Sequence, residues 1–352
     1  MRRLRIAYVL RVFPKLSETF IVGELAELRR RGVEVHILSL EPPREQLRHR
    51  EVADAGLDAL TSYDVTRFDD ELRRLRPHVL HAHFATEATA AARRLARVHG
   101  VPYTFTAHGY DVYRRPPGDF ALRAADAATV VTVSAANAQY IEETFGVARA
   151  KLRVIPCGID LRRFTPGPAC DEALILAVAR LSPVKRIDVL LDACALLRGR
   201  GLSFRCVVVG DGRCRDELEA QRRTLGLEEH VTLAGAAEQA EVVRWWQRAS
   251  IAVLSSDREG MPVCLMEAAA SGVPAVAPAV GGIPELVADG VTGLLVPPGN
   301  VEALADALER LLRRRDLARA LGRAARARAA ERFSVRTQVD RLLGVWEEAA
   351  RA

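Results

Sequence analysis

The chain has 352 residues, of which 49% are hydrophobic and 27% are charged, a composition typical of a globular protein and not of a disordered or fibrous one. This length is too great for one ordinary core and fits two α/β domains, each with its own buried interior. No apolar run approaches the roughly 20 residues needed to cross a bilayer, so we expect no membrane-spanning helix.

The formal net charge is +6, and the positive excess lies in the first half of the chain. Residues 1–165 contain 26 lysines and arginines against 20 aspartates and glutamates, whereas residues 166–352 contain 25 of each. Clusters of arginine occur at 29–31, 73–74, 93–94 and 114–115. They could form a face attracted to anionic lipid or to a pyrophosphate group, or they could be ordinary solvated helix surface. Nucleic acid is not an expected partner, because only 5% of residues are aromatic and no basic stretch is interleaved with aromatics.

The N-terminus and the cysteines indicate a cytoplasmic protein. Residues 1–10 are basic and then apolar, but the apolar part is too short for a signal peptide and is typical of a first strand. The six cysteines include no Cys-x-x-Cys pair and no spacing typical of zinc sites or disulfide frameworks. We therefore expect reduced thiols.

In the first half, apolar strand-like runs alternate with helical stretches, which predicts a parallel sheet covered on both faces. The expected strands are 5–10, 33–40, 79–83, 104–106 and 129–134, and the clearest helix is 19–31. Residues 156–168 are dense in proline and glycine and are predicted to connect two domains, with the boundary at 165/166.

The second half repeats the pattern. The expected strands are 173–179, 204–209, 230–233, 251–255 and 275–277, followed by long amphipathic helices at 301–315 and from 334 onward. Near-continuous Val, Ile and Ala runs are typical of strands buried on both faces. Two doubly wound sheets in series are therefore predicted, with ligands at the carboxyl ends of the strands, in a cleft between the domains.

The loop from Phe13 to Phe20 lies between the first strand and the first helix. Ser17 or Thr19 can cap that helix. Capping does not explain Glu18, which is expected at the mouth of the cleft, where it can accept a hydrogen bond from a ligand hydroxyl.

Three of the histidines in or after predicted strands are candidate functional residues. His81 and His83 share one strand face, as in some metal sites, yet no cysteine or carboxylate cluster with ligand spacing accompanies them and no Asp-x-Asp motif is present. We therefore expect no catalytic metal. His108 lies in the turn Thr106-Ala107-His108-Gly109-Tyr110-Asp111 at a strand end, where a histidine by itself is usually an ordinary loop residue.

Arg180 and Lys185 follow the first strand of the second domain, and both are expected at its carboxyl edge. A guanidinium can bind two phosphate oxygens and an ammonium adds a point charge, so the pair suits a departing diphosphate. Gly210, after the next strand, belongs to an incomplete dinucleotide fingerprint and is better explained as a tight turn lining the same site.

Glu259 and Glu267 are eight positions apart around the start of an apolar helix, with Glu267 expected about two turns inside it. Because eight residues nearly restore the angular position on a 3.6-residue helix, both carboxylates can face one site. Between them lie Gly260, Met261, Pro262 and Val263, whose N–H groups point along the helix axis toward a bound anion. Pro262 has no N–H and suits a helix start, so the expected donors are Met261 and Val263.

These motifs, in this order, resemble glycosyltransferase family 4, the retaining nucleotide-sugar transferases of the GT-B fold. The family signature is Glu, seven residues, Glu, and the run Gly281-Gly282-Ile283-Pro284-Glu285 follows it here as in the family. The histidine turn and the Arg…Lys pair also match. Where many members have a glycine-rich loop, this chain instead resembles the Phe-Pro-x-x-Ser-Glu-Thr-Phe loop of the colanic-acid and exopolysaccharide branch. The resemblance covers nearly the whole chain.

The resemblance implies two Rossmann-like domains facing each other across a cleft. The two are an acceptor-side domain (1–165) and a nucleotide-sugar domain (166–333). A C-terminal helix (334–352) is expected to cross back to the first domain. It implies that Glu267 holds the ribose hydroxyls, Glu259 the sugar, and Arg180 with Lys185 the diphosphate. His108 is expected to contact the donor sugar near the reacting carbon and to stabilise the oxocarbenium-like transition state. Asp111 either orients His108 or contacts the acceptor, together with Ser17 and Glu18.

The implied activity is a metal-independent, retaining hexosyltransferase of polysaccharide biosynthesis that needs no cofactor. Its donor would be a nucleotide-diphosphate sugar, in the first place a UDP-sugar. Its acceptor would be a hydroxyl of a glycan, a lipid-linked sugar or a small molecule. Peripheral contact of the first domain with the inner face of an anionic membrane remains open. The alternatives are a nucleotide-sugar epimerase of the same fold and a two-lobed nucleotide-sugar binding protein without activity.

Overall fold

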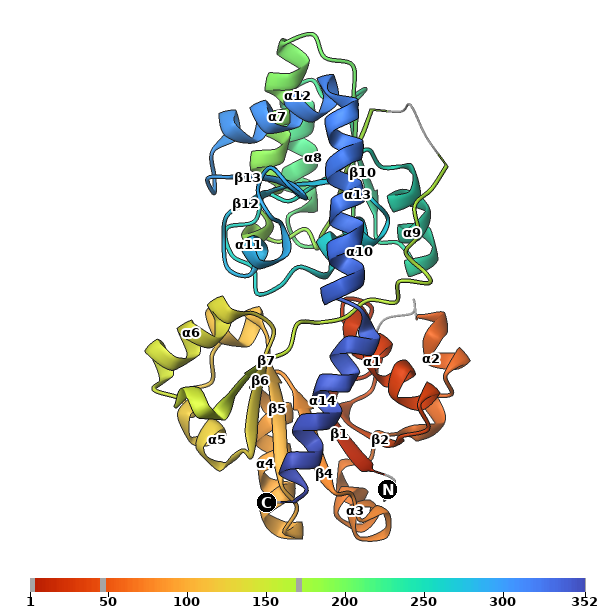
Figure 1. The fold of residues 1–352 in the computed structure, drawn as a ribbon, viewed down its shortest axis with the longest axis vertical. Coiled ribbons are helices and arrows are strands. Elements are labelled where there is room, and N and C mark those ends of the chain that lie inside the picture. Colours follow the sequence, from red (N-terminus) through yellow and green to blue (C-terminus); the bar gives the residue numbers. More distant parts are fainter. Residues whose placement is uncertain (1–3, 45–48, 169–172, 352) are drawn as a thin grey trace. The chain divides into compact units, whose positions relative to one another are not determined.

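The computed structural model describes residues 4–44, 49–168 and 173–351 (Figure 1). Its contacts divide the chain into two compact units, one of Met1–Gly158 with Val335–Ala352 and one of Ile159–Ser334. The division falls earlier than the breaker-rich sequence suggests. Ile159 already belongs to the second unit, where its N–H donates to the carbonyl of Phe333 at 2.9 Å.

The first unit is built on a parallel sheet with the strand order β3-β2-β1-β4-β5-β6-β7 among the described residues. Its strands are β1 (Arg5–Val12), β2 (Glu34–Glu41), β3 (Thr61–Ser62), β4 (Val79–His83), β5 (Tyr103–Ala107), β6 (Thr129–Thr132) and β7 (Leu152–Val154). Its helices are α1 (Thr19–Arg30), α2 (Arg50–Asp54), α3 (Phe68–Leu75), α4 (Glu87–His99), α5 (Phe120–Asp126), α6 (Ala135–Phe145) and α14 (Val335–Ala349).

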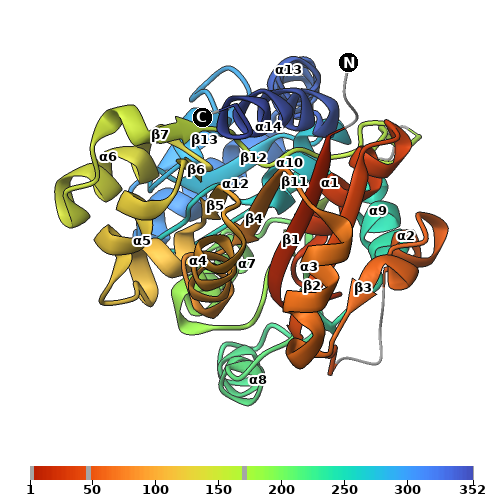
Figure 2. The same ribbon diagram turned by 90° about the horizontal axis from the view of Figure 1, so that it is seen from below.

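Helices cover both faces of this sheet (Figure 2). Alternate residues of β1 enter two separate cores, Ala7 and Val9 with α3 to α6 on one face, and Ile6 and Tyr8 with α1 and α14 on the other. This alternation follows from the two-residue period of a strand. The C-terminal helix α14 lies beside α1 (Figure 1), so the end of the chain completes the core of the first unit.

The second unit contains a parallel sheet with the strand order β10-β9-β8-β11-β12-β13 among the described residues. Its strands are β8 (Leu174–Val178), β9 (Arg205–Val209), β10 (Val231–Gly235), β11 (Ile251–Val253), β12 (Ala275–Pro278) and β13 (Gly293–Val296). Its helices are α7 (Ile187–Gly199), α8 (Arg215–Thr224), α9 (Gln239–Arg248), α10 (Val263–Ala270), α11 (Ile283–Leu286), α12 (Val301–Arg313) and α13 (Arg315–Arg332).

Each sheet reverses its strand order once, between β1 and β4 in the first unit and between β8 and β11 in the second. In open parallel sheets, ligands bind outside the carboxyl ends of the strands at such a reversal. The predicted site loops follow these strands and their neighbours, so the topology gathers them at one edge of each sheet.

The predicted α/β class with parallel, helix-covered sheets is confirmed. Strands β3, β7 and β13 and helix α13 were not among the predicted elements. The three strands are short, and β13 begins at Gly293, so their apolar signal is weak. None of the helices in the described ranges combines the length and the apolar character needed to cross a bilayer.

Candidate active site

In the second unit, the loops after β8 and β9 approach each other closely. The N–H of Ala179 donates to Val209 and that of Leu181 donates to Asp211, both at 3.0 Å, which extends the strand pairing. A Cβ at Gly210 would lie 1.9 Å from the carbonyl oxygen of Ala179, so only glycine fits there. Gly210 therefore acts through backbone packing, which holds the segment leading to the exposed Arg180 at the edge of the sheet.

Lys185 and Glu259 are brought together from two different loops of this edge. Lys185 Nζ lies 2.5 Å from Glu259 Oε1, which also accepts a hydrogen bond from Ser256 Oγ at 2.7 Å. Ser255 Oγ donates to the carbonyl of Lys185 at 2.9 Å, which fixes the lysine backbone. Burial acts to lower the pKa of Lys185, but attraction to Glu259 outweighs it and the pKa is raised. The ammonium is therefore firmly charged at neutral pH.

The glycine pair predicted to follow the glutamates holds the backbone of Glu259. Gly281 has a φ of +51°, and a Cβ there would lie 1.8 Å from the carbonyl oxygen of Glu259. The N–H of Gly282 reaches the same oxygen at 3.4 Å. The Gly-Gly run thus packs against the backbone of Glu259, which links the two motifs in space.

Helix α10 begins at Val263 with Pro262 in the N-cap position, and no side chain caps it. The first N–H groups of a helix lack partners within the helix and carry its positive end, so this terminus is suited to an anion. Glu267 is the fifth residue of α10, just over one turn inside and not the two turns expected. The sequence estimate was wrong because Gly260 and Met261 precede the helix.

Glu267 lies in very different surroundings from Glu259. Its side chain is 5% exposed and Oε2 accepts a hydrogen bond from Trp246 Nε1 at 3.3 Å. Burial raises its pKa to about 7, against the opposing effects of hydrogen bonds from Trp246 and Gln239 and the charge of Arg163. Arg163 in turn donates to Gln239 Oε1 at 2.6 Å. Sequence reasoning missed these three neighbours, which come from the connecting segment and from α9 and carry no motif.

In the first unit, His108 directly follows β5 and begins the turn that continues to Asp111. The carboxylate of Asp111 accepts the backbone N–H of His108 at 2.9 Å and that of Ala85 at 2.6 Å. Asp111 is fully buried, and burial raises its pKa to about 7, opposed by these backbone hydrogen bonds. Asp111 therefore ties the loop after β4 to the turn that carries His108.

The imidazole of His108 is held on several sides and remains 7% exposed. Ring centroids of Phe20 and Phe84 lie 4.8 Å and 4.6 Å away, and His83 Nδ1 lies 3.1 Å from His108 Nε2. Phe84 has a φ of 68°, which is a strained conformation for an aromatic residue. Such strained conformations cluster at functional sites. Burial, with repulsion from His83, keeps the pKa of His108 well below its usual value, so the ring is neutral.

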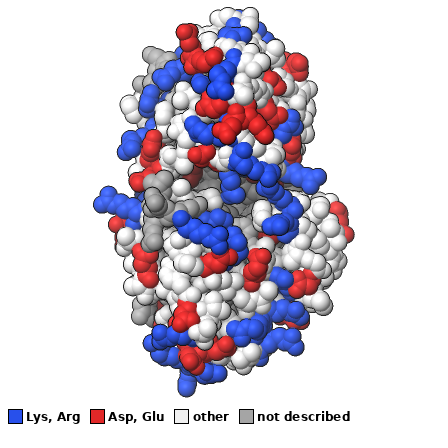
Figure 3. All heavy atoms as spheres, turned by 180° about the vertical axis from the view of Figure 1, so that it is seen from behind, with Lys and Arg blue, Asp and Glu red and all other residues white. Residues whose placement is uncertain are grey.

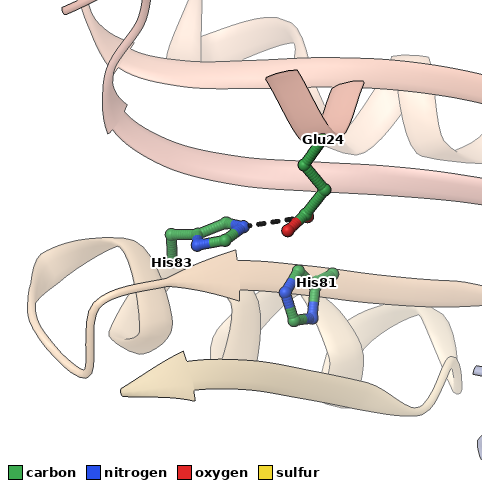
Figure 4. Close-up of side chains that lie close together, drawn as sticks. All are labelled: Glu24, His81 and His83. Atoms are coloured by element: carbon green, nitrogen blue, oxygen red, sulfur yellow. Dashed lines mark hydrogen bonds and ion pairs between the residues drawn. The ribbon is translucent and has the colours of Figure 1, made fainter. Parts of the chain in front are cut away.

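Glu24 from α1 lies close to His81 and His83 of β4 (Figure 4), and His83 in turn contacts His108. One ligand atom from each of these three side chains lies within 4.8 Å of the others, a set that could hold a metal ion. The sequence spacing gave no indication of this carboxylate, because Glu24 comes from α1, which packs against the sheet and brings it to the histidine pair.

The same three side chains are, however, already hydrogen-bonded. His81 contacts Thr104 and Thr106 through its two ring nitrogens, at 2.8 Å and 3.1 Å. Glu24 accepts from Tyr8 and Gln338, and His83 Nε2 lies 3.2 Å from its Oε1. A metal would have to displace these bonds, so the arrangement fits a closed hydrogen-bond network better than an open metal site.

The loop before α1 has its own ion pair. Lys15 Nζ lies 2.6 Å from Glu18 Oε1, and Glu18 occupies the N-cap position of α1 without a side-chain capping bond. Ser17 is exposed one residue earlier, and Thr19 is already inside the helix. Glu18, and not Ser17 or Thr19, therefore occupies the N-cap position of α1.

The arginine clusters of the first unit are partly neutralised by neighbouring acids. Arg30 and Arg31 both bind Glu27, at 2.6 Å and 2.8 Å, and their hydrogen bonds lower the pKa of Glu27 to about 2. The other pairs are Arg73 with Asp70, Arg93 with Asp126 and Arg94 with Asp69. On the face drawn in Figure 3, basic side chains are interspersed with acidic ones.

Known proteins share both halves of this architecture. The family described as glycosyltransferase family 4 matches residues 17–163, and the family described as glycosyl transferases group 1 matches residues 159–328. The D-inositol 3-phosphate glycosyltransferase of Frankia alni is 32% identical over 80% of this chain and 78% of its own length. The putative colanic acid biosynthesis glycosyltransferase WcaL of Escherichia coli is 28% identical over 87% of this chain and 90% of its own length.

Solved structures agree on the fold. A glycosyltransferase from Rickettsia africae superposes with a TM-score of 0.84 at 19% identity, covering 99% of both chains. Anabaena Alr3699/HepE in complex with UDP-glucose superposes with a TM-score of 0.81 at 19% identity, covering 97% of this chain and 98% of that one. With the two Rossmann-like sheets and the matching motifs, these similarities show that the chain belongs to glycosyltransferase family 4 and is a GT-B enzyme of the hexosyltransferase type.

Proposed function

We propose that this enzyme transfers a hexose from a UDP-sugar, with retention of anomeric configuration, to a hydroxyl of a glycan, a lipid-linked sugar or a small molecule. The observation that carries the donor half of the proposal is the Lys185–Glu259 pair beside the uncapped start of α10. It places a cation, helix N–H groups and a carboxylate at one strand edge, the chemistry that a sugar diphosphate requires. UDP is favoured because Alr3699/HepE has been solved with UDP and UDP-glucose.

In the donor site, Arg180 and Lys185 would neutralise the diphosphate as its charge grows toward the transition state. The backbone donors of Met261 and Val263 would bind a phosphate oxygen, with Gly260 and Pro262 shaping the turn. Glu267 would accept both ribose hydroxyls, and Glu259 a sugar hydroxyl. Because these protein groups supply the positive charge, we propose that the reaction needs neither a metal nor a cofactor.

His108 would act on the donor sugar near its reacting carbon. A neutral, tightly held imidazole can accept a hydrogen bond from a sugar hydroxyl and stabilise the oxocarbenium-like transition state without a change of charge. In the proposed reaction, the acceptor oxygen bonds to the anomeric carbon on the face that the leaving group departs from. The bond to the β-phosphate oxygen breaks, and that phosphate takes the acceptor proton.

Ser17 and Glu18 are proposed to contact the acceptor, Ser17 because it is exposed and Glu18 because its carboxylate is held by Lys15 next to the end of β1. Of the two roles considered for Asp111, we propose the orienting one. Its oxygens accept from backbone N–H groups, and its side chain is buried. Acceptor candidates follow the relatives' names: intermediates of exopolysaccharides such as colanic acid, and an inositol phosphate.

Calorimetry with UDP, GDP and ADP, followed by transfer assays with matching sugar nucleotides, tests the proposal. We expect UDP to bind most tightly, activity to survive a chelator, and the product to keep the donor's anomeric configuration by NMR. Inverted product would overturn retention, and loss of activity with chelator would overturn metal independence. Conversion of the nucleotide sugar to an epimer without an acceptor would identify an epimerase instead, and binding with no turnover would identify a binding protein.

A further inference from the structure

The hydrogen-bond network beneath His108 has a defined direction, and it begins at a backbone group. The N–H of Gly158, which can only donate, contacts Gln338 Oε1 at 2.7 Å. The amide oxygen of Gln338 therefore faces Gly158, and its NH₂ faces Glu24 Oε2 at 2.6 Å. Gln338 thus donates to Glu24, which fixes that carboxylate as an acceptor.

The other oxygen of Glu24, Oε1, connects the carboxylate to the histidines. Glu24 Oε1 accepts the hydroxyl of Tyr8 and lies 3.2 Å from His83 Nε2. Both oxygens of Glu24 already accept, from Tyr8 and from Gln338, so Oε1 also accepts from His83, which places the His83 proton on Nε2. With a single ring proton, placed on Nε2, His83 has a bare Nδ1, which accepts from His108 Nε2, 3.1 Å away.

We propose that Glu24 and His83 are positioning residues that hold His108 as the Nε2–H tautomer, so that His108 Nδ1 accepts a hydrogen bond from a hydroxyl of the donor sugar. The contacts of His108 within the described ranges leave Nδ1 unengaged. Phe20 and Phe84 pack against the ring and restrict its rotation, so the orientation of Nδ1 is fixed as well. This inference rests on the proposed function for the identity of the ligand, and on the network alone for the tautomer.

The low pKa of His108 supports a single neutral tautomer across the working pH range. The same holds for His81, whose pKa is lowered by burial and by the neighbouring histidines. His81 has its own fixed direction, because Trp346 Nε1–H donates to its Nδ1 at 3.3 Å. The proton of His81 therefore faces Thr106 and takes no part in the Glu24–His83–His108 chain.

Glu24→Gln is the decisive variant, because it should reverse the chain. Gly158 still fixes Gln338 as a donor, so the oxygen of the new amide must face Gln338 and its NH₂ must face His83. His83 Nε2 then accepts, its proton moves to Nδ1, and His108 Nε2 becomes the acceptor. His108 is left with its proton on Nδ1, where it can no longer accept from a sugar hydroxyl.

Long-range ¹H–¹⁵N spectra of protein labelled at its eight histidines report each tautomer directly. His108 is assigned by its loss in His108→Gln. We expect the Nε2–H form in the wild type and the Nδ1–H form in Glu24→Gln, with kcat reduced roughly 10- to 100-fold and the Kd for UDP unchanged. Tyr8→Phe is the matched control, since it removes a donor to the same Glu24 oxygen without reversing the chain. It should keep both the tautomer and kcat.

A wild-type spectrum with the His108 proton on Nδ1 overturns the inference, and this measurement does not depend on whether Glu24→Gln folds. A reversed tautomer with unchanged kcat overturns the catalytic relevance of the network. Failure of the proposed function looks different. No UDP-sugar would then bind or react, while the wild-type and variant spectra would still show the two tautomers.

Discussion

Lys185 and Glu259 lie in two separate loops of the second unit and form an ion pair, with Nζ 2.5 Å from Oε1. Both side chains are largely buried, so neither charge is well solvated. A diphosphate that binds Lys185 would either share the lysine with Glu259 or displace Glu259 from it. Displacement would free Glu259 to accept a sugar hydroxyl. The pair can thus couple binding of the phosphates to binding of the sugar.

Lys185→Ala should lower kcat at least as much as it raises KM for the donor. The reason is that negative charge on the departing diphosphate grows toward the transition state, where the ammonium acts most strongly. Steady-state kinetics with the best donor measure both parameters. The neighbouring Arg186, which pairs with Asp188 and Asp257, provides the control, and Arg186→Ala should change kcat by no more than about twofold. An effect of Lys185→Ala on KM alone would show that the lysine only binds.

Gly281→Ala should abolish most donor binding. A methyl group there would lie 1.8 Å from the carbonyl oxygen of Glu259, so the loop that carries Glu259 must move. Gly290→Ala is a matched control, because Gly290 also has a positive φ, +69°, but has no atom within 4 Å of the added Cβ. Backbone strain at this φ should lower the unfolding free energy of the variant by about 1 kcal/mol, and its Kd for UDP should stay unchanged. Equal donor affinities in the two variants would contradict the anchoring role.

Much of the donor site could be predicted because its parts are local in sequence. Apolar runs mark strands buried on both faces, and Arg180, Gly210 and Glu259 each follow such a run, so the order of strands alone gathers them. The Glu267 surroundings could not be predicted in the same way. Arg163 and Gln239 come from segments without any motif, and only the tertiary fold places them beside the carboxylate.

The Gln338–Glu24–His83–His108 hydrogen-bond network could not be predicted, because its members lie far apart in the sequence. Glu24 and Gln338 are 314 positions apart and meet only because α14 packs beside α1. In sequence, a glutamate on an amphipathic helix is ordinarily a solvent-exposed residue, and nothing near Glu24 indicates that it is fully buried. Histidines on a strand face can be noticed, but their partner from another element cannot be.

Membrane association should depend on Arg114 and Arg115 more than on residues 29–31. Arg30 and Arg31 are held by Glu27, whereas Arg114 and Arg115 are exposed and have no acidic partner within the described ranges. Reversing both to glutamate should reduce sedimentation with anionic vesicles at low salt. Because such attraction is screened over about 10 Å at about 0.1 M salt, the wild type should also dissociate as salt is raised.

The control for this charge reversal is Arg313→Glu with Arg314→Glu in the second unit, which changes the net charge equally. It should leave vesicle binding close to that of the wild type. If both double variants lose binding equally, only net charge matters. If the wild type binds anionic vesicles no better than neutral ones, the first domain does not contact anionic membranes and a small-molecule acceptor is favoured.

Glu267 should make donor binding depend on pH around neutrality. Burial raises its pKa to about 7, so near pH 7 about half of the free protein carries a protonated Glu267. Only the ionised form accepts both ribose hydroxyls, so binding releases a proton and the affinity for UDP should rise from about pH 6 to about pH 8. UDP titrates near pH 6 as well. The Glu267→Gln variant should keep the pH dependence that comes from UDP and lose the part that comes from Glu267. At high pH it should also lose roughly 1.5 to 3 kcal/mol of donor affinity.

The same pKa shift predicts an opposite effect on the stability of the free enzyme. A carboxyl group whose pKa is raised on folding stabilises the fold while it is protonated, and this contribution is lost as the pH rises from about 4.5 through about 7. Relative to Glu267→Gln, the wild type should therefore lose up to about 3 kcal/mol of unfolding free energy over that interval, measured by urea unfolding at each pH. If the difference between the two proteins stays constant with pH while UDP affinity still varies, the ionisation belongs to another group. Glu267 would then not be the ribose ligand that controls donor binding.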